Sequence, residues 1–242
     1  NILHSIFPVP KSLELIRTVK AASKPISLCC RDGIIYVGND SAFTIEKITA
    51  NGEVQKDFIK LDGFVSSMKV VKGELYVLVC SSPARQYKIK VFNLEGQFTR
   101  TWEHVDSDNY LNKLGVCGER IVLPNRKDKT LDMYSSHGKI LKTLTLPHMT
   151  ETQVAVASAG NNSVIISHYD SNHVFKVDIN SGETLWDSTH FKHPRGITCV
   201  DDRYVYVTND ENMSTAYILD AQTGNVVMLE ELATFSDIGS EP

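Results

Sequence analysis

The sequence lacks the features that would place it in several large classes of protein. None of its apolar runs approaches the roughly 18 residues of a transmembrane helix. The first residues, NILHSIFPVPKS, have neither the charged segment nor the apolar segment of a secretory signal peptide. They also lack an initiator methionine, so we expect a piece of a longer protein. The formal net charge of −4 gives no global attraction to nucleic acid or to acidic membranes. We therefore expect neither a membrane protein nor a DNA-binding protein.

Cysteine is scarce and has no recognisable pattern. The chain has five cysteines, namely Cys29, Cys30, Cys80, Cys117 and Cys199. None belongs to a C-x-x-C pair, and four lie in or at the end of apolar strings, where a reduced thiol behaves as a small hydrophobic group. An odd number of unpatterned cysteines favours a reducing compartment, so we expect a cytoplasmic location.

Catalytic and metal-binding motifs are also missing. The sequence has no G-x-S-x-G, H-E-x-x-H, G-x-G-x-x-G or phosphate-loop motif. Two pairs of nearby histidines, His168 with His173 and His190 with His193, have no cysteine partner at a spacing known for zinc. We therefore predict no catalytic residue, no bound metal and no cofactor.

What the sequence does contain is a repeat. In Pro194–Asp210, PRGITCVDDRYVYVTND, a tight acidic turn joins two apolar strings rich in β-branched and aromatic residues, which is typical of a β-hairpin. Similar doublets occur four times earlier in the chain, and each doublet is followed by a second pair of strings hinged on a glycine. The hinge glycines are Gly52, Gly96, Gly138, Gly182 and Gly224, at spacings of 44, 42, 44 and 42 residues. Glycine suits these turns because a tight hairpin needs a positive φ.

A period of about 43 residues with four short strands per unit predicts an all-β protein, a β-propeller of four-stranded blades. The first two strings of each unit are nearly continuous in apolar residues, as expected for inner strands buried on both faces. The last two alternate between polar and apolar residues, as in Lys88–Phe92. An immunoglobulin-like sandwich would also be all-β, but it does not predict a glycine at this period.

We expect residues 1–242 to form one propeller domain, in which the closing blade is incomplete. Full blades are expected at residues 23–61, 62–105, 106–147, 148–189 and 190–232. Residues 1–22 resemble the outer two strands of a further blade, and residues 233–242 resemble the start of an inner strand. We therefore expect six blades with the closing blade incomplete in this chain, and a ring of five blades is the alternative.

Two stretches resemble the NHL repeat. They are P-x-G-I with Y-V-T-N in Pro194–Asp210, and K-V-F-N-x-x-G-x-F within Lys88–Trp102. The markers of WD40 and kelch repeats are missing, although those propellers share the architecture. Val79 and Cys80 depart from the acidic or Asn-Asp ending of the usual NHL repeat. NHL propellers occur at the C-terminus of tripartite-motif (TRIM-NHL) ubiquitin ligases, where they recognise protein or RNA. The resemblance thus implies a recognition module that is part of such a ligase.

Candidate binding residues follow from the expected rim of loops. The ends of the second strands provide one set, Asn39, Val79, Asn125, His168 and Asn209, for which capping of turns is the simplest role. For a protein partner or ubiquitination substrate we predict aromatic, arginine and other basic contacts, because aromatic and arginine side chains dominate interface energetics. These contacts are Phe64, Arg85, Tyr110, Arg126, Lys127, His193 and Arg195.

Single-stranded RNA is the alternative ligand. Its bases unstack and can meet aromatic rings, while basic side chains neutralise phosphates. The corresponding residues are Lys24, Arg85, Tyr87, Lys88, Tyr110, Arg126 and Lys127. A propeller hydrolase or lyase is a less favoured alternative, since no nucleophile has a credible base. The leading hypothesis is a non-catalytic module that binds a protein.

Overall fold

All regular elements in the described part of the computed structural model are β-strands. The structure describes residues 19, 24–81, 86–104, 113–125, 128–146, 154–210 and 215–231. These residues form five four-stranded antiparallel sheets, in which neighbouring strands follow one another in sequence. The described residues include no helix of the length and apolar character needed to cross a bilayer.

Each sheet is one blade. Blade 1 contains β1 (Pro25–Arg31), β2 (Ile34–Asn39), β3 (Thr44–Ile48) and β4 (Val54–Lys60). Blade 2 contains β5 (Gly63–Val71), β6 (Glu74–Ser81), β7 (Gln86–Asn93) and β8 (Phe98–His104). Blade 3 contains β9 (Gly115–Cys117), β10 (Arg120–Asn125), β11 (Thr130–Tyr134) and β12 (Ile140–Thr145). Blade 4 contains β13 (Val154–Ser158), β14 (Ser163–His168), β15 (His173–Asp178) and β16 (Thr184–Ser188). Blade 5 contains β17 (Pro194–Val200), β18 (Tyr204–Asn209), β19 (Thr215–Asp220) and β20 (Val226–Glu231).

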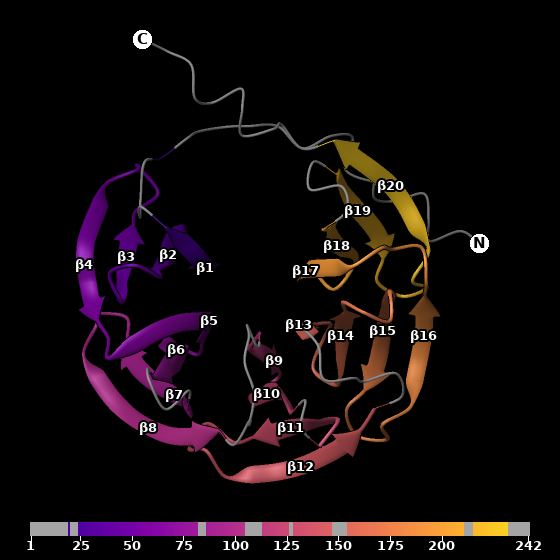
Figure 1. Ribbon diagram of the computed structural model, residues 1–242, viewed down its shortest axis with the longest axis horizontal. Coiled ribbons are helices and arrows are strands. Elements are labelled where there is room, and N and C mark those ends of the chain that lie inside the picture. The colour runs from indigo at the N-terminus through magenta and orange to yellow at the C-terminus, as the bar shows by residue number, and fades with distance from the viewer. Residues whose placement is uncertain are drawn as a thin grey trace.

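The blades are arranged around a common centre, with the first strand of each blade innermost (Figure 1). Successive inner strands contact one another, β1 with β5, β5 with β9, β9 with β13 and β13 with β17. This confirms the predicted β-propeller of four-stranded blades, and the five-blade alternative is the one that matches. The six-blade expectation rested on residues 1–22 and 233–242, all of which except Val19 lie outside the described residues. Blades 1 and 5 border an opening in the ring of described strands.

The hinge glycines support the turns as predicted. All five have a positive φ, from 73° at Gly224 to 88° at Gly52. The amide of each hinge glycine donates to a carbonyl three or four residues earlier, as from Gly96 to Asn93 over 3.0 Å. The recurring glycine therefore marks the turn between the third and fourth strands of a blade.

The same glycines also serve the contacts between blades. A Cβ placed on Gly138 would lie 2.4 Å from the ring of Trp102, which belongs to the outer strand of the preceding blade. The contact recurs around the ring with a bulky residue of one blade and the hinge glycine of the next: Phe58 with Gly96, Trp102 with Gly138, Leu144 with Gly182, and Trp186 with Gly224. The missing side chain makes room for the preceding blade, so glycine is needed here for close packing as well as for its backbone angle.

A basic side chain reinforces each of these four interfaces. It donates to a backbone carbonyl in the hinge of the next blade: Lys47 Nζ to Leu94 O over 3.2 Å, Arg100 Nε to Ser136 O over 2.8 Å, Lys142 Nζ to Asn180 O, and Lys176 Nζ to Ala221 O over 2.9 Å. Arg100 also forms a bidentate pair with Glu74, over 2.6 and 2.7 Å. Hydrogen bonds from Arg100 hold the pKa of the Glu74 carboxyl below its usual value.

Burial differs from the expected pattern. We predicted that the first two strands of each blade would be the most buried. β14, a second strand, fits this prediction because all of its residues are buried, but every residue of β11, a third strand, is buried as well. In β1, by contrast, Leu28 is 64% exposed. The reason is geometric, because first strands face the centre of the ring and β1 and β17 also border the opening (Figure 1).

Candidate functional site at the rim and centre of the ring

Three of the polar residues that end the second strands cap turns, as expected, whereas Asn209 Oδ1 is buried without a hydrogen-bond partner. Asn39 Oδ1 accepts from Ser41 N over 3.3 Å, and Asn125 Oδ1 accepts from Asp128 N over 3.2 Å. In blade 4 an imidazole takes the same role, because His168 Nδ1 accepts from the backbone N–H of Ser171 over 3.2 Å. These three residues therefore shape loops on one rim of the propeller, and their own polar atoms are engaged within the turns.

Three of the predicted protein-binding residues lie in the described part of the chain. Phe64 is in β5, 37% exposed, with its ring 4.7 Å from the ring of Phe43. His193 precedes β17, and Arg195 is its second residue. Phe64 and Arg195 lie near the starts of inner strands in blades 2 and 5, so they share a rim without being neighbours. The other four predicted contacts, Arg85, Tyr110, Arg126 and Lys127, lie outside the described residues.

On this rim four side chains form a connected group, which we call the rim cluster: Tyr169, His193, Arg195 and Asp210. The rings of Tyr169 and His193 stack with centroids 4.6 Å apart. The Tyr169 hydroxyl donates to Asp210 Oδ2 over 2.7 Å, and Arg195 Nη1 donates to Asp210 Oδ1 over 2.9 Å. These hydrogen bonds, that from Tyr169 above all, lower the pKa of Asp210. The rim cluster joins blade 4 to blade 5.

Sequence reasoning found only half of the rim cluster. It named His193 and Arg195 but missed Tyr169 and Asp210. A signal was present, because Tyr169 directly follows β14 and Asp210 directly follows β18, so both come just after the second strand of their blades. Comparing this position across the repeats would have paired them.

The described members of the RNA-binding set do not form an open stacking surface. Tyr87 is only 3% exposed, so the prediction that its ring stacks on a base is wrong. The alternation of β7 turns Tyr87, Ile89 and Val91 into the core, where they pack in one hydrophobic cluster. The two lysines face carboxylates, Lys24 at 2.8 Å from Asp40 and Lys88 at 3.9 Å from Glu103.

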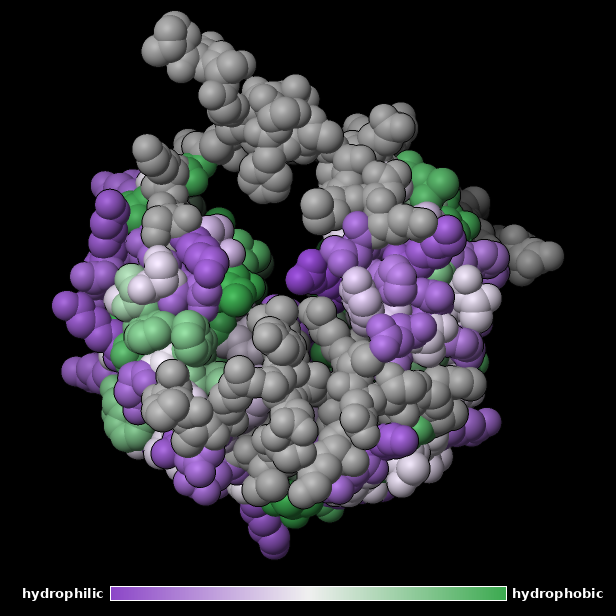
Figure 2. Space-filling view, in the orientation of Figure 1, coloured by the Kyte–Doolittle hydropathy of each residue, from purple (hydrophilic) through white to green (hydrophobic). Residues whose placement is uncertain are grey.

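A cavity of about 160 Å³ occupies the centre of the ring. All five blades line it with residues at equivalent distances from their first hairpin turn. One set of equivalent positions holds Ser27, Ser67, Lys113, Ala155 and Gly196, and the next holds Leu28, Met68, Leu114, Val156 and Ile197. Figure 2 shows hydrophilic surface on the blade 5 side of the central opening and hydrophobic surface on the blade 1 side.

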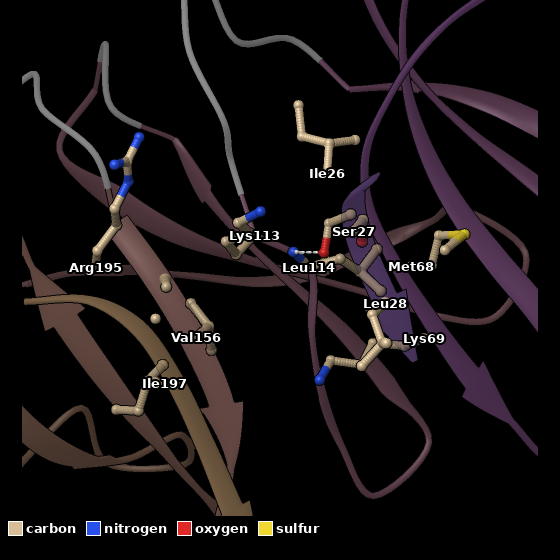
Figure 3. A pocket seen from close by; sticks show the side chains of 13 residues that line it. Ile26, Ser27, Leu28, Met68, Lys69, Lys113, Leu114, Val156, Arg195 and Ile197 are labelled. Carbon is tan, nitrogen blue, oxygen red and sulfur yellow. Dashed lines mark hydrogen bonds between the residues drawn. The ribbon is translucent and has the colours of Figure 1, made fainter. Parts of the chain in front are cut away.

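The charge of this cavity is entirely positive among the described residues that line it. Lys69, Lys113 and Arg195 come from three blades around the same hollow (Figure 3), and none of the described lining residues is acidic. The Lys113 segment is fixed to β5, since Leu114 N donates to Ser67 Oγ over 3.0 Å and Lys113 Nζ donates to Ser66 O over 3.3 Å. Burial, and then the positive charges of Arg195 and Lys69, hold the pKa of Lys113 below its usual value.

Metal binding and thiol chemistry have little support in the described residues. Within the described ranges, no group of three or more His, Cys, Asp or Glu side chains is placed to hold a metal ion. Burial raises the pKa of Cys29 to about 12 and those of Cys117 and Cys199 to about 11. These thiols stay protonated near neutral pH and are poor nucleophiles.

The five sheets define a β-propeller, with the rim cluster on one face. Residues 32–228 match the family described as "Outer membrane protein assembly factor BamB". The match spans more than half of the chain, and the chain belongs to this family. No protein in the curated collection matches it. The family match does not extend to NHL repeats, so the NHL and TRIM-NHL resemblance stays a prediction.

Solved structures share the propeller fold at low sequence identity. A protein of unknown function from Bacteroides caccae aligns with a TM-score of 0.65 at 12% identity, over 86% of this chain and 81% of that one. Virginiamycin B lyase from Staphylococcus aureus aligns with 0.63 at 15% identity, over 88% and 71%. The WD40 propeller domain of Doa1 aligns with 0.64 at 16% identity, over 86% and 68%. These similarities describe the fold alone.

Proposed function

We propose that this propeller is a non-catalytic recognition module that binds a protein partner at the rim bearing Tyr169, His193 and Arg195. The rim cluster carries the proposal. Tyrosine and arginine are the residue types that most often dominate interface energetics. Here they come from two blades and are held by hydrogen bonds to Asp210, so little side-chain entropy remains to be lost on binding.

The family match supports the same proposal, that the propeller binds a protein partner. Its description names an assembly factor, and a protein of that kind works by contacting the components that it helps to assemble. A place in a larger ubiquitin ligase, which the NHL resemblance implies, is a narrower form of this proposal. Single-stranded RNA is the competing ligand that the experiment must separate.

The test is affinity capture with the immobilised chain, followed by a measurement of affinity for the captured protein. We expect Tyr169→Ala and Arg195→Ala each to weaken binding on the order of tenfold or more, as hot-spot residues do. Arg31→Ala is the matched control, because Arg31 ends β1 at the opposite rim and is exposed. Equal capture by all variants would mean that the partner uses another face. Capture abolished by nuclease would favour RNA.

A further inference from the structure

The centre of the ring brings together three positive charges, of which only Arg195 is paired with a carboxylate among the described residues. Lys69 comes from β5, Lys113 from the residues before β9, and Arg195 from β17. Arg195 has a carboxylate partner in Asp210. Within the described residues, neither Lys69 nor Lys113 has a carboxylate within ion-pair distance. Two lysines thus face one hollow without an anion to balance them.

Lys113 is out of place among its equivalents. The same position in the other four blades carries Ser27, Ser67, Ala155 and Gly196, all of them small. A lysine in this set adds an amino group at a position where the other blades carry small residues. Its reduced exposure and the nearby charges of Arg195 and Lys69 disfavour its protonated form. An anion in the cavity would relieve this repulsion.

The size of the cavity suits a small anion. A volume of about 160 Å³ leaves room for several water molecules. A carboxylate with a short aliphatic stem fits such a space. The second set of lining positions, Leu28, Met68, Leu114, Val156 and Ile197, offers apolar contact to that stem.

We propose that the centre of the ring is a binding site for a carboxylate on a short chain, held by Lys69 and Lys113 with Arg195 at its edge. Two sources carry this chemistry, a free small organic acid and an acidic side chain of a bound protein. Only the second source rests on the proposed function. The first tests the cavity by itself.

The experiment is an NMR titration of the isotope-labelled chain at constant ionic strength, with sodium chloride as the balancing salt. The probes are succinate and a pair of capped peptides, one with alternating Gly and Glu and the other with Gln in place of Glu. The test variant is Lys69→Met with Lys113→Met. The control variant, Lys56→Met with Lys60→Met, removes the same charge from the exposed outer strand β4.

We expect saturable shifts of the cavity amides with succinate, with the Glu peptide or with both, and no response to the Gln peptide. The test variant should bind about tenfold more weakly or worse, which is the usual effect of losing hydrogen bonds to a charged group. The control variant should bind as the wild type does. A response to succinate identifies a free acid as a sufficient ligand, and a response to the Glu peptide alone identifies a side chain.

The proposal is overturned if neither probe gives saturable shifts, or if the test and control variants lose binding equally. Failure here leaves the proposed function standing, because that is also tested with Tyr169→Ala, and Tyr169 does not line the cavity. Conversely, loss of partner binding by Tyr169→Ala does not affect the succinate titration of Lys69 and Lys113.

Discussion

The interfaces between blades and the centre of the ring both contain basic side chains, but they use them differently. In the interfaces, Lys47, Arg100 and Lys176 each donate to a hinge carbonyl of the next blade, and Arg100 is also paired with Glu74. At the centre, Lys69 and Lys113 share a cavity in which no described lining residue is acidic. The first arrangement ties adjacent blades through hinge carbonyls. At the centre, Lys113 also donates to Ser66 O of blade 2, but neither lysine has a carboxylate partner among the described residues, and we propose that a ligand balances this charge. The residue type alone does not distinguish the two roles.

The largest expected effect concerns the interfaces. Gly138→Ala should destabilise the fold by about 3 kcal/mol, because it adds left-handed backbone strain of about 1 kcal/mol to overpacking of about 2 kcal/mol against Trp102. Gly73→Ala is the matched control, since Gly73 has a similar positive φ with nothing near its missing Cβ. It should cost about 1 kcal/mol. Urea unfolding measures both, and equal losses would show that blade packing does not require the glycine.

A smaller effect is expected for the Arg100 pair. Arg100→Met leaves the half-buried Glu74 carboxylate without its bidentate partner and Ser136 O without its donor. We expect a loss of about 2 kcal/mol, below the range for fully buried pairs because both groups are partly exposed. Arg31→Met, at an exposed ion pair, should change the unfolding free energy by less than about 0.5 kcal/mol. A loss of less than about 0.5 kcal/mol for Arg100→Met would show that the pair with Glu74 contributes little to stability.

The same pair predicts a dependence on pH. Because Arg100 holds the folded pKa of Glu74 below the usual 4.5, the carboxylate stabilises the fold fully above about pH 4.5. That contribution is lost as the pH falls through the lower, folded value. The difference in unfolding free energy between the wild type and Glu74→Gln should therefore be largest at neutral pH and should shrink in acid. A difference that is constant from pH 7 to pH 3 would contradict this.

The smallest effect concerns thiol reactivity. Cys30 is exposed, whereas Cys29 and Cys117 are buried with pKa values raised to about 12 and about 11. A thiol reagent should modify Cys30 first, and Cys29 and Cys117 only after unfolding. Mass spectrometry of the labelled chain, with Cys30→Ser as the control, reads this directly. Rapid labelling of Cys117 in the folded chain would show that blade 3 opens. The reducing compartment expected from these cysteines stays a prediction.

Much of the fold was predictable from the sequence because every blade of a propeller is built from the same four strands and turns. Gly52, Gly96, Gly138, Gly182 and Gly224 mark the same turn in every blade, so their period was enough to predict four-stranded units. Burial was predicted less well, since the position of a strand relative to the ring centre depends on neighbouring blades. For that reason Leu28 in β1 is exposed although its string is apolar.

The site was predictable only in part, because it arises between repeats. His193 and Arg195 stood out as side chains next to a strand, but their partners Tyr169 and Asp210 come from the ends of β14 and β18. The three charges at the centre are 126 positions apart at their extremes, Lys69 and Arg195. Nothing local in the sequence places them around one cavity, and only the closure of the blades around the centre does so.

The most direct test of the contrast is the unfolding free energy of two lysine variants without any added organic acid. Lys176 is buried and donates to Ala221 O between blades 4 and 5, so Lys176→Met should lose on the order of 1 kcal/mol or more. Lys113→Met relieves the burial of a charge and the repulsion with Lys69 and Arg195, but it also loses the hydrogen bond from Lys113 Nζ to Ser66 O, so its unfolding free energy should stay close to that of the wild type. If Lys113→Met is destabilised as much as Lys176→Met, the central lysine is a structural residue and the charge at the centre of the ring is not reserved for a ligand.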